Sequence, residues 1–262
     1  MGQFKKALRY LDEKFFGSYF VELRGYSLLL KQRQEFDSSF HRSIRINYDY
    51  RHNDLAALCD NYGTDKGSNR EYNPSDKWPS HTYTDFYHEV FGKTRFEYKN
   101  IFECGIGTNN SEVKGHFKLQ GTPGASLRVW RDFFPNAMIF GADIDPRALV
   151  HENRITSQVM DQLDPNSILE YFKSMGFPSF DLMIDDGLHE FHAGKILYEN
   201  AIQYLKPGGV YIIEDVVLDD LISYRSFFSN SKHLVQYVSM QRAKVGLKSI
   251  AHNSLVVIEK RD

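Results

Sequence analysis

Short apolar runs alternate with helix-length stretches from about residue 100 onward, and this alternation constrains the fold more than any other feature. Each run ends in glycine or an acidic residue, and the runs are NIFECGIG, MIFGADID, SQVMDQ, FDLMIDDG and GGVYIIEDV. Between them lie SLRVWRDFF, PNSILEYFKSM and HAGKILYENAIQYL. Strands separated by helices require right-handed crossovers and a parallel sheet covered on both faces. The pattern predicts a doubly wound α/β domain.

The remaining apolar patterns complete a predicted sheet of seven strands and add an arm. HLVQYVSM and NSLVVIEK predict the last two strands, as an antiparallel hairpin at one edge. Apolar residues at helical spacing in residues 4–33 predict an amphipathic helical arm over 1–53, ahead of the domain at 54–262. The arm either serves oligomerisation, a substrate lid or membrane-surface anchoring, or packs on its own domain, which base rates favour.

Composition argues against several functions. The 262 residues contain 32 Lys and Arg against 34 Asp and Glu, a net charge of −2, so the basic excess typical of nucleic-acid binding is missing. Cys59 and Cys104 have no partner spacing for a disulfide framework or a zinc site. No segment reaches the roughly 18 apolar residues of a membrane span. The N-terminus lacks a cleavage site, so we expect mature sequence in the cytoplasm.

Polar residues follow each predicted strand, where open α/β sheets bind ligands. The turn Glu103-Cys-Gly-Ile-Gly-Thr108 allows close backbone approach to a ligand, with Gly105 and Gly107 as its glycines. It is a poor dinucleotide fingerprint, because Asn110 replaces the third glycine. Asp143 suits a ribose diol, and Asp161 with Gln162 suits an adenine edge. Each residue taken alone fits a helix cap or a turn equally well.

A sharper cluster is expected where the fourth and fifth strands end. Asp185, Asp186 and His189 follow one strand, and Glu214 and Asp215 follow the next. Crowded carboxylates repel unless a cation or protons compensate, and oxygen ligands favour Mg²⁺ or a similar divalent ion. A histidine beside the ion is placed to act as a base. The alternative is that Asp186 caps the following helix, with His189 in its first turn, while Glu214 and Asp215 pair with basic residues.

The order of these motifs resembles class I S-adenosylmethionine-dependent methyltransferases. More narrowly, it resembles the metal-dependent sugar O-methyltransferases of macrolide biosynthesis, of the mycinamicin and demethylmacrocin type. The resemblance covers about residues 54–218. It rests on Gly63-Thr-Asp-Lys-Gly67, His81-x-Tyr83, FECGIGT, SLRVWRDFFPNAMIFGADID, MDQLD, FDLMIDDGLHEF and LKPGGVYIIEDV. One departure is Leu188, where the family usually has serine.

The resemblance implies a role for each candidate residue. His189 is the expected general base, with Asp186 also in the catalytic set, and Mg²⁺ is expected on Asp186, Glu214 and Asp215. The loop of Gly63–Gly67, with His81 and Tyr83, either closes over a ligand or anchors itself. The residues expected around S-adenosylmethionine are Thr64, Lys66, Glu103, Gly105, Gly107, Ser126, Asp143, Ile144, Asp161, Gln162 and Asp185.

The function implied is methyl transfer from S-adenosylmethionine to a sugar hydroxyl, with Mg²⁺ chelating a diol. The acceptor is a glycosylated natural product or a glycan precursor, such as one for capsule or lipopolysaccharide. Two other classes stay open: a partner protein that keeps the cofactor fold without catalysis, and an NAD-dependent oxidoreductase, which the glycine pattern disfavours. A homo-oligomer is a further expectation, and a nucleic-acid partner is not expected.

Overall fold

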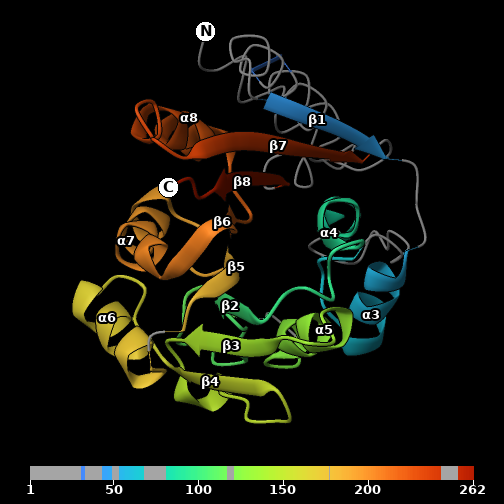
Figure 1. Ribbon diagram of the computed structural model, residues 1–262, viewed down its shortest axis with the longest axis vertical. Helices are drawn as coiled ribbons and strands as arrows, with labels where there is room; N and C mark the ends of the chain where they lie inside the picture. Colours follow the sequence, from blue (N-terminus) through green and yellow to red (C-terminus); the bar gives the residue numbers. More distant parts are fainter. Residues whose placement is uncertain are drawn as a thin grey trace, which may run out of the picture.

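A single mixed sheet of eight strands organises the protein (Figure 1). The computed structural model describes residues 31–32, 43–48, 53–67, 81–116, 121–176, 178–242 and 253–262. The strand order is β1-β7-β8-β6-β5-β2-β3-β4. The strands are β1 Ser43–Tyr48, β2 Asn100–Cys104, β3 Met138–Asp143, β4 Ile155–Val159, β5 Phe180–Asp185, β6 Leu205–Ile213, β7 Leu234–Arg242 and β8 Ser254–Glu259.

The doubly wound, mostly parallel arrangement of the seven predicted strands is confirmed. Strands β2 to β6 pair in parallel, and β8 runs antiparallel to both β6 and β7. The predicted hairpin of β7 and β8 therefore exists, with β8 inserted next to β6.

Strand β1 adds an eighth strand, which the sequence analysis did not predict. It pairs in parallel with β7, Ser43 opposite Tyr237, and it comes from the segment predicted to be a helical arm. Its sequence, SIRINY, alternates polar and apolar residues, which is the period of a strand. The helices predicted within residues 4–33 lie outside the described residues, apart from Lys31 and Gln32, which are helical.

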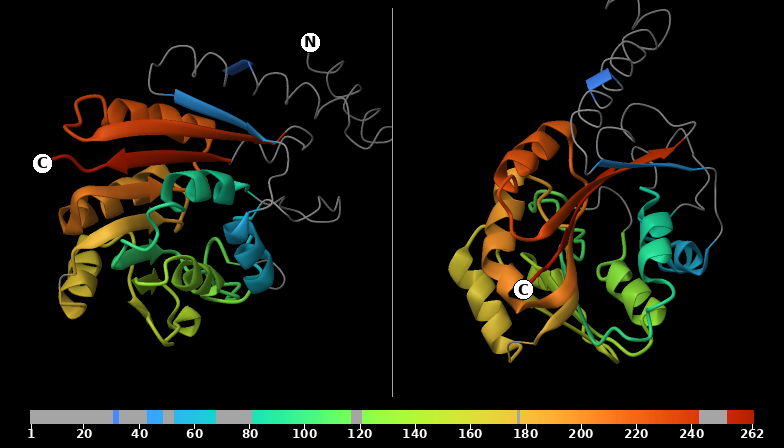
Figure 2. Two further views of the ribbon diagram at one scale, coloured as in Figure 1. Left: turned by 45° about the vertical axis from the view of Figure 1, so that its right-hand side comes forward. Right: turned by 45° about the horizontal axis from the view of Figure 1, so that its top comes forward.

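Six α-helices in the described residues cover the two faces of the sheet. Helices α6, α7 and α8 lie on one face, and α3, α4 and α5 lie on the other (Figure 2). Each face has its own apolar cluster, one around Phe102, Phe172 and Tyr211 and the other around Tyr87 and Trp130. The helices are α3 Asp54–Tyr62, α4 Tyr83–Phe91, α5 Ala125–Phe133, α6 Pro165–Ser174, α7 Phe191–Ala201 and α8 Leu218–Phe227.

Both cysteines are free and buried, as a core role predicts. Burial raises the pKa of the Cys59 thiol to about 12, and it also raises the pKa of Cys104 well above its usual range. Neither thiol is therefore a ready nucleophile. Of the helices in the described ranges, none combines the length and apolar character that a membrane crossing needs.

Candidate functional site

The carboxyl ends of β2, β5 and β6 lie at one level of the sheet. Asp185, the last residue of β5, is in register with Cys104 of β2 and with Ile213 of β6. Backbone bonds continue past the strand ends: the Asp186 amide donates to the Cys104 carbonyl, and the Glu214 amide donates to the Asp185 carbonyl, each at 2.9 Å. The loops after the three strands are thus held side by side, at the edge where α/β sheets bind ligands.

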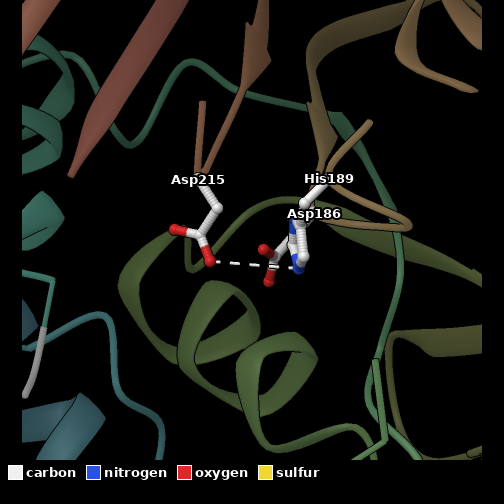
Figure 3. Close-up of side chains that lie close together, drawn as sticks. All are labelled: Asp186, His189 and Asp215. Atoms are coloured by element: carbon white, nitrogen blue, oxygen red, sulfur yellow. Dashed lines mark ion pairs between the residues drawn. The ribbon is translucent and has the colours of Figure 1, made fainter. Parts of the chain in front are cut away.

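Asp186, His189 and Asp215 form a compact set at this edge, which we call the acid–histidine group (Figure 3). One ligand atom from each residue lies within 4.8 Å of the others, and His189 Nε2 is 3.9 Å from Asp215 Oδ2. His189 and Asp215 have φ values of 55° and 54°. This left-handed conformation is strained for residues other than glycine, and such strain concentrates at functional sites.

The donor set of the acid–histidine group fits a divalent cation. The two carboxylates suit a hard ion, with the imidazole beside it, and ligands on opposite sides of Mg²⁺ lie about 4 Å apart. Small side-chain movements would close the group around such an ion. Helix α7 begins at Phe191, with Glu190 at its N-cap position. The alternative interpretation, in which Asp186 caps this helix, is therefore wrong.

Glu214 does not join the acid–histidine group, although the resemblance places it among the metal ligands. Its Oε2 lies 2.5 Å from Lys66 Nζ, and its Oε1 accepts a hydrogen bond from the Tyr87 hydroxyl at 2.5 Å. The side chain is only 1% exposed, and burial raises the pKa of Glu214 well above its usual range. The alternative expectation, that this carboxylate pairs with a basic residue, describes its contacts better.

The Lys66 ammonium lies among three carboxylates. It is 2.5 Å from Asp186 Oδ2, 2.5 Å from Glu214 Oε2 and 3.6 Å from Glu103 Oε1. Burial favours the neutral amine, but attraction to these acids outweighs it and raises the pKa of Lys66 well above its usual range. Lys66 was predicted to bind the cofactor. In the structure its ammonium group instead contacts protein carboxylates.

A loop fixed by backbone bonds brings Lys66 to the strand ends. Gly63 ends α3 in the left-handed conformation, with φ 80°, which turns the chain toward the sheet. The His81 amide donates to the Asp65 carbonyl at 2.7 Å, and the Thr84 amide donates to the Lys66 carbonyl at 3.2 Å. Within this loop the half-buried Thr64 accepts a bond from the Lys66 amide, so its predicted contact with the cofactor stays a prediction.

His81 and Tyr83 hold Asp215. The Tyr83 hydroxyl donates to Asp215 Oδ1 at 2.6 Å and accepts from the Asp215 amide at 3.1 Å. His81 stacks on Tyr83, and its Nδ1 is 3.2 Å from Asp215 Oδ1. Burial raises the pKa of Asp215, but His81, His189 and the Tyr83 bond outweigh burial, so the pKa is lowered overall. These two residues anchor a member of the acid–histidine group.

Sequence reasoning missed Tyr87, whose hydroxyl is bonded to Glu214. One signal was available: Tyr83 and Tyr87 are four residues apart on α4, a spacing that puts both side chains on one helical face. The structure shows that this face points at the end of β6 and supplies hydroxyls to Glu214 and Asp215.

Glu103 and the glycine turn that follows β2 lie beside Lys66. Glu103 is fully buried, its Oε2 accepts from the Ser126 hydroxyl at 2.6 Å, and its Oε1 has no hydrogen-bond partner. Burial raises the pKa of Glu103 to about 7. Gly105 has φ 83°, and a Cβ there would lie 2.1 Å from the Asp186 carbonyl oxygen. Gly107 has φ 81°. The Glu103 Oε1 atom lies 3.6 Å from the Lys66 ammonium, so the expected contact of Glu103 with the cofactor stays a prediction.

The carboxylate of Asp143 braces the same turn. Its Oδ2 accepts from the Ile106 amide at 3.1 Å, and its Oδ1 accepts from the Asp145 amide at 3.0 Å. The Gly107 amide also donates to this carboxylate, which leaves one lone pair free, so the expected ribose contact stays a prediction. Ile144, the next residue, is 46% exposed at the end of β3, where a ligand base could cover it.

Gln162 and Asp161 have internal partners at the end of β4. Gln162 donates to Asp185 Oδ1 at 2.7 Å and accepts from the Leu188 amide at 2.9 Å. Asp161 accepts from the Leu163 amide at 2.8 Å. Gln162 therefore positions Asp185 and the loop that bears His189. One N–H and one lone pair of its amide remain, so the expected adenine contact stays a prediction.

No protein-family model matches the sequence. Demethylmacrocin O-methyltransferase of Streptomyces fradiae is 36% identical over 141 residues, which are 53% of this chain and 33% of that protein. The 8-demethyl-8-alpha-L-rhamnosyl tetracenomycin-C 2'-O-methyltransferase of Streptomyces olivaceus is 32% identical over 142 residues, 54% of this chain and 35% of that protein. The matched segment is thus about a third of the length of these curated relatives.

Among solved structures, the fold is similar to that of MycE, a methyltransferase from the mycinamycin biosynthetic pathway, in complex with Mg, SAH and mycinamycin VI. The TM-score is 0.57 at 24% identity, over 80% of this chain and 55% of the MycE chain. The chain therefore has the fold of a class I methyltransferase, and its predicted resemblance to O-methyltransferases of the mycinamicin and demethylmacrocin type is confirmed.

Proposed function

We propose that the protein is a divalent-metal-dependent O-methyltransferase that transfers the methyl group of S-adenosylmethionine to a sugar hydroxyl. The acid–histidine group next to the glycine turn carries this proposal, because it joins a candidate ion site, a base and a candidate cofactor turn at one sheet edge. The similarity to sugar O-methyltransferases supports it.

The residues divide into two sets in this proposal. Glu103 and the turn of Gly105 and Gly107 bind the amino-acid end of S-adenosylmethionine, since the positive φ of both glycines leaves the backbone of the turn open to a close approach. Asp186 and Asp215 hold the ion. Glu214 supports them through Lys66, which contacts both Glu214 and Asp186.

A sugar hydroxyl is a weak nucleophile at neutral pH because its pKa is far too high for ionisation. A bound divalent ion lowers that pKa by stabilising the developing alkoxide. His189, whose Nε2 is 3.9 Å from Asp215 Oδ2, accepts the proton as the oxygen attacks the methyl group, the sulfur–methyl bond breaks and S-adenosylhomocysteine leaves. Holding the two reactants at contact distance supplies the rest of the acceleration.

The acceptor in this proposal is a hydroxyl of a glycosylated natural product or of a glycan precursor. The names of the curated relatives favour the first, since one acts on a rhamnosyl tetracenomycin and another on mycinamicin VI.

Calorimetric titration with S-adenosylhomocysteine, with and without Mg²⁺ and with NAD⁺ as control, tests the cofactor class. We expect saturable binding of S-adenosylhomocysteine and none of NAD⁺. Methyl transfer to sugar acceptors, followed as a mass gain, should then stop in EDTA and return with Mg²⁺. Absence of S-adenosylhomocysteine binding would reject the proposal and favour a partner-binding role, and full turnover in EDTA would reject the metal.

A further inference from the structure

A small pocket of about 10 Å³, with room for one water-sized group, opens beside the acid–histidine group, on the face of the sheet covered by α7 and α8. His189 and Asp215 line one side of it, so the pocket borders both the proposed base and a proposed ion ligand. The other sides include Asp185 at the end of β5, Glu190 at the start of α7, and Asp220 and Tyr224 on α8. We call this space the acidic pocket.

The charge of the acidic pocket is one-sided. Five of its lining residues are Asp or Glu, and none is Lys or Arg. Four of these acids have partners: Glu190 pairs with Lys114, Asp220 accepts the backbone amide of Phe191, Glu214 contacts Lys66, and Asp215 accepts from the Tyr83 hydroxyl. A buried carboxylate without a counter-charge is costly. A bound cation would therefore be stabilised most by an acid that lacks such a partner.

Asp185 is that acid. It is 3% exposed, and its Oδ1 is held by Gln162 at 2.7 Å and by the Gly187 amide at 3.3 Å. Its Oδ2 is buried, lies at the pocket and has no hydrogen-bond partner. Sequence reasoning placed Asp185 among the cofactor residues, whereas the structure places its free oxygen beside α7 and α8.

Gly194 makes room at this point. A Cβ at Gly194 would lie 2.1 Å from the Tyr224 hydroxyl oxygen and 3.1 Å from Asp185 Oδ2. Glycine thus lets the Tyr224 hydroxyl and the Asp185 carboxylate approach the backbone of α7 together. One small group in this corner of the pocket can therefore contact both Asp185 Oδ2 and the Tyr224 hydroxyl.

A protonated amine fits these two oxygen atoms better than a hydroxyl or an anion does. An ammonium donates to Asp185 Oδ2 and to the Tyr224 oxygen and also neutralises the carboxylate. A hydroxyl would donate one bond and leave the charge uncompensated, and an anion would be repelled. The pocket shares His189 and Asp215 with the acid–histidine group, so an amine bound there would belong to the same sugar as the reacting hydroxyl, or to an adjoining one.

We propose that the acidic pocket binds the protonated amino group of the acceptor and that the preferred acceptor is an aminodeoxy sugar. This inference rests on the proposed function and narrows its substrate class.

The test uses the protein saturated with S-adenosylhomocysteine and Mg²⁺. The probes are the methyl glycosides of glucose and of 2-, 3- and 4-amino-deoxyglucose, and calorimetry measures their affinity. At least one amino glycoside should bind about tenfold or more tightly than the glucoside, as a charge-assisted hydrogen bond predicts. Asp185→Asn should remove this preference, and Tyr224→Phe should weaken it while S-adenosylhomocysteine binding persists.

Asp219→Asn is the matched control, since Asp219 is exposed on α8 next to Asp220 and does not line the pocket. It should keep the preference for the amine. Equal binding, or no binding, of the amino glycosides by a protein that binds S-adenosylhomocysteine overturns the inference and leaves the proposed function standing. Failure to bind S-adenosylhomocysteine rejects the proposed function itself.

Discussion

Removal of the Lys66 charge is expected to destabilise the protein strongly. The ammonium is 4% exposed and contacts Asp186 and Glu214 at 2.5 Å. Lys66→Met would leave Glu214 buried, with Tyr87 as its remaining partner. Breaking a buried ion pair on one side costs about 3–5 kcal/mol. At about 2–4 °C per kcal/mol for a domain near this size, the melting temperature should fall by roughly 6–20 °C.

Thermal unfolding followed by circular dichroism measures this change. Lys195→Met is the control, because Lys195 is 39% exposed and its pair with Glu199, at 3.8 Å, is a surface contact. Its loss should be worth less than about 1 kcal/mol. The decisive comparison is the double variant Lys66→Met with Glu214→Gln, which removes the stranded charge and should be more stable than Lys66→Met alone. A double variant that is less stable than Lys66→Met would refute the reasoning.

Three further changes test the strand-end loops. Glu103 has a pKa raised to about 7 in the folded state from 4.5, so the native state holds the proton more tightly, and stability should fall by about 3 kcal/mol as pH rises from 4.5 to 7. Guanidinium unfolding at several pH values measures this dependence of stability on pH. Glu103→Gln should flatten it, and Glu170→Gln, an exposed change on α6, should keep it. An unchanged dependence in Glu103→Gln contradicts the assignment. Asp186→Asn should weaken Mn²⁺ binding, measured by electron paramagnetic resonance, by about tenfold or more, and equal affinity would remove Asp186 from the ion site. Gly105→Ala should destabilise the protein by at least about 2 kcal/mol more than Gly176→Ala. Both glycines have positive φ, but only at Gly105 would the added Cβ lie 2.1 Å from a backbone oxygen. Equal losses of stability by chemical denaturation would mean that the clash is relieved.

The expectation that ligand-binding residues follow the strand ends predicted which loops come together. It did not predict the direction in which each side chain points. Consecutive residues at a strand end point in opposite directions, so Asp185 and Asp186 separate: Asp185 faces Gln162 and the acidic pocket, and Asp186 faces Lys66. Glu214 and Asp215 both accept hydroxyl groups from α4, but only Glu214 contacts Lys66 and only Asp215 joins the acid–histidine group. A run of acids in a sequence predicts a charged edge, and the backbone geometry decides which of them form one site.

Contacts between distant segments were beyond the reach of local patterns. Lys66 and Tyr87 meet Glu214 across 148 and 127 residues of chain, and no periodicity encodes such a pairing. Strand β1 was missed for a related reason, because its six residues lie next to a longer helical pattern and gain their partner only from β7.

The position of β8 ties the order of synthesis to the assembly of the sheet. It lies between β6 and β7 although it follows both in the chain. Strands β7 and β1 therefore cannot join the sheet next to β6 until residues 254–259, which form β8, have left the ribosome. Strand β1 is made before every other described strand, yet it is joined to the rest of the sheet only through β7. Its backbone must therefore wait while β2 to β8 are made, a period in which unpaired strand edges are vulnerable to wrong partners.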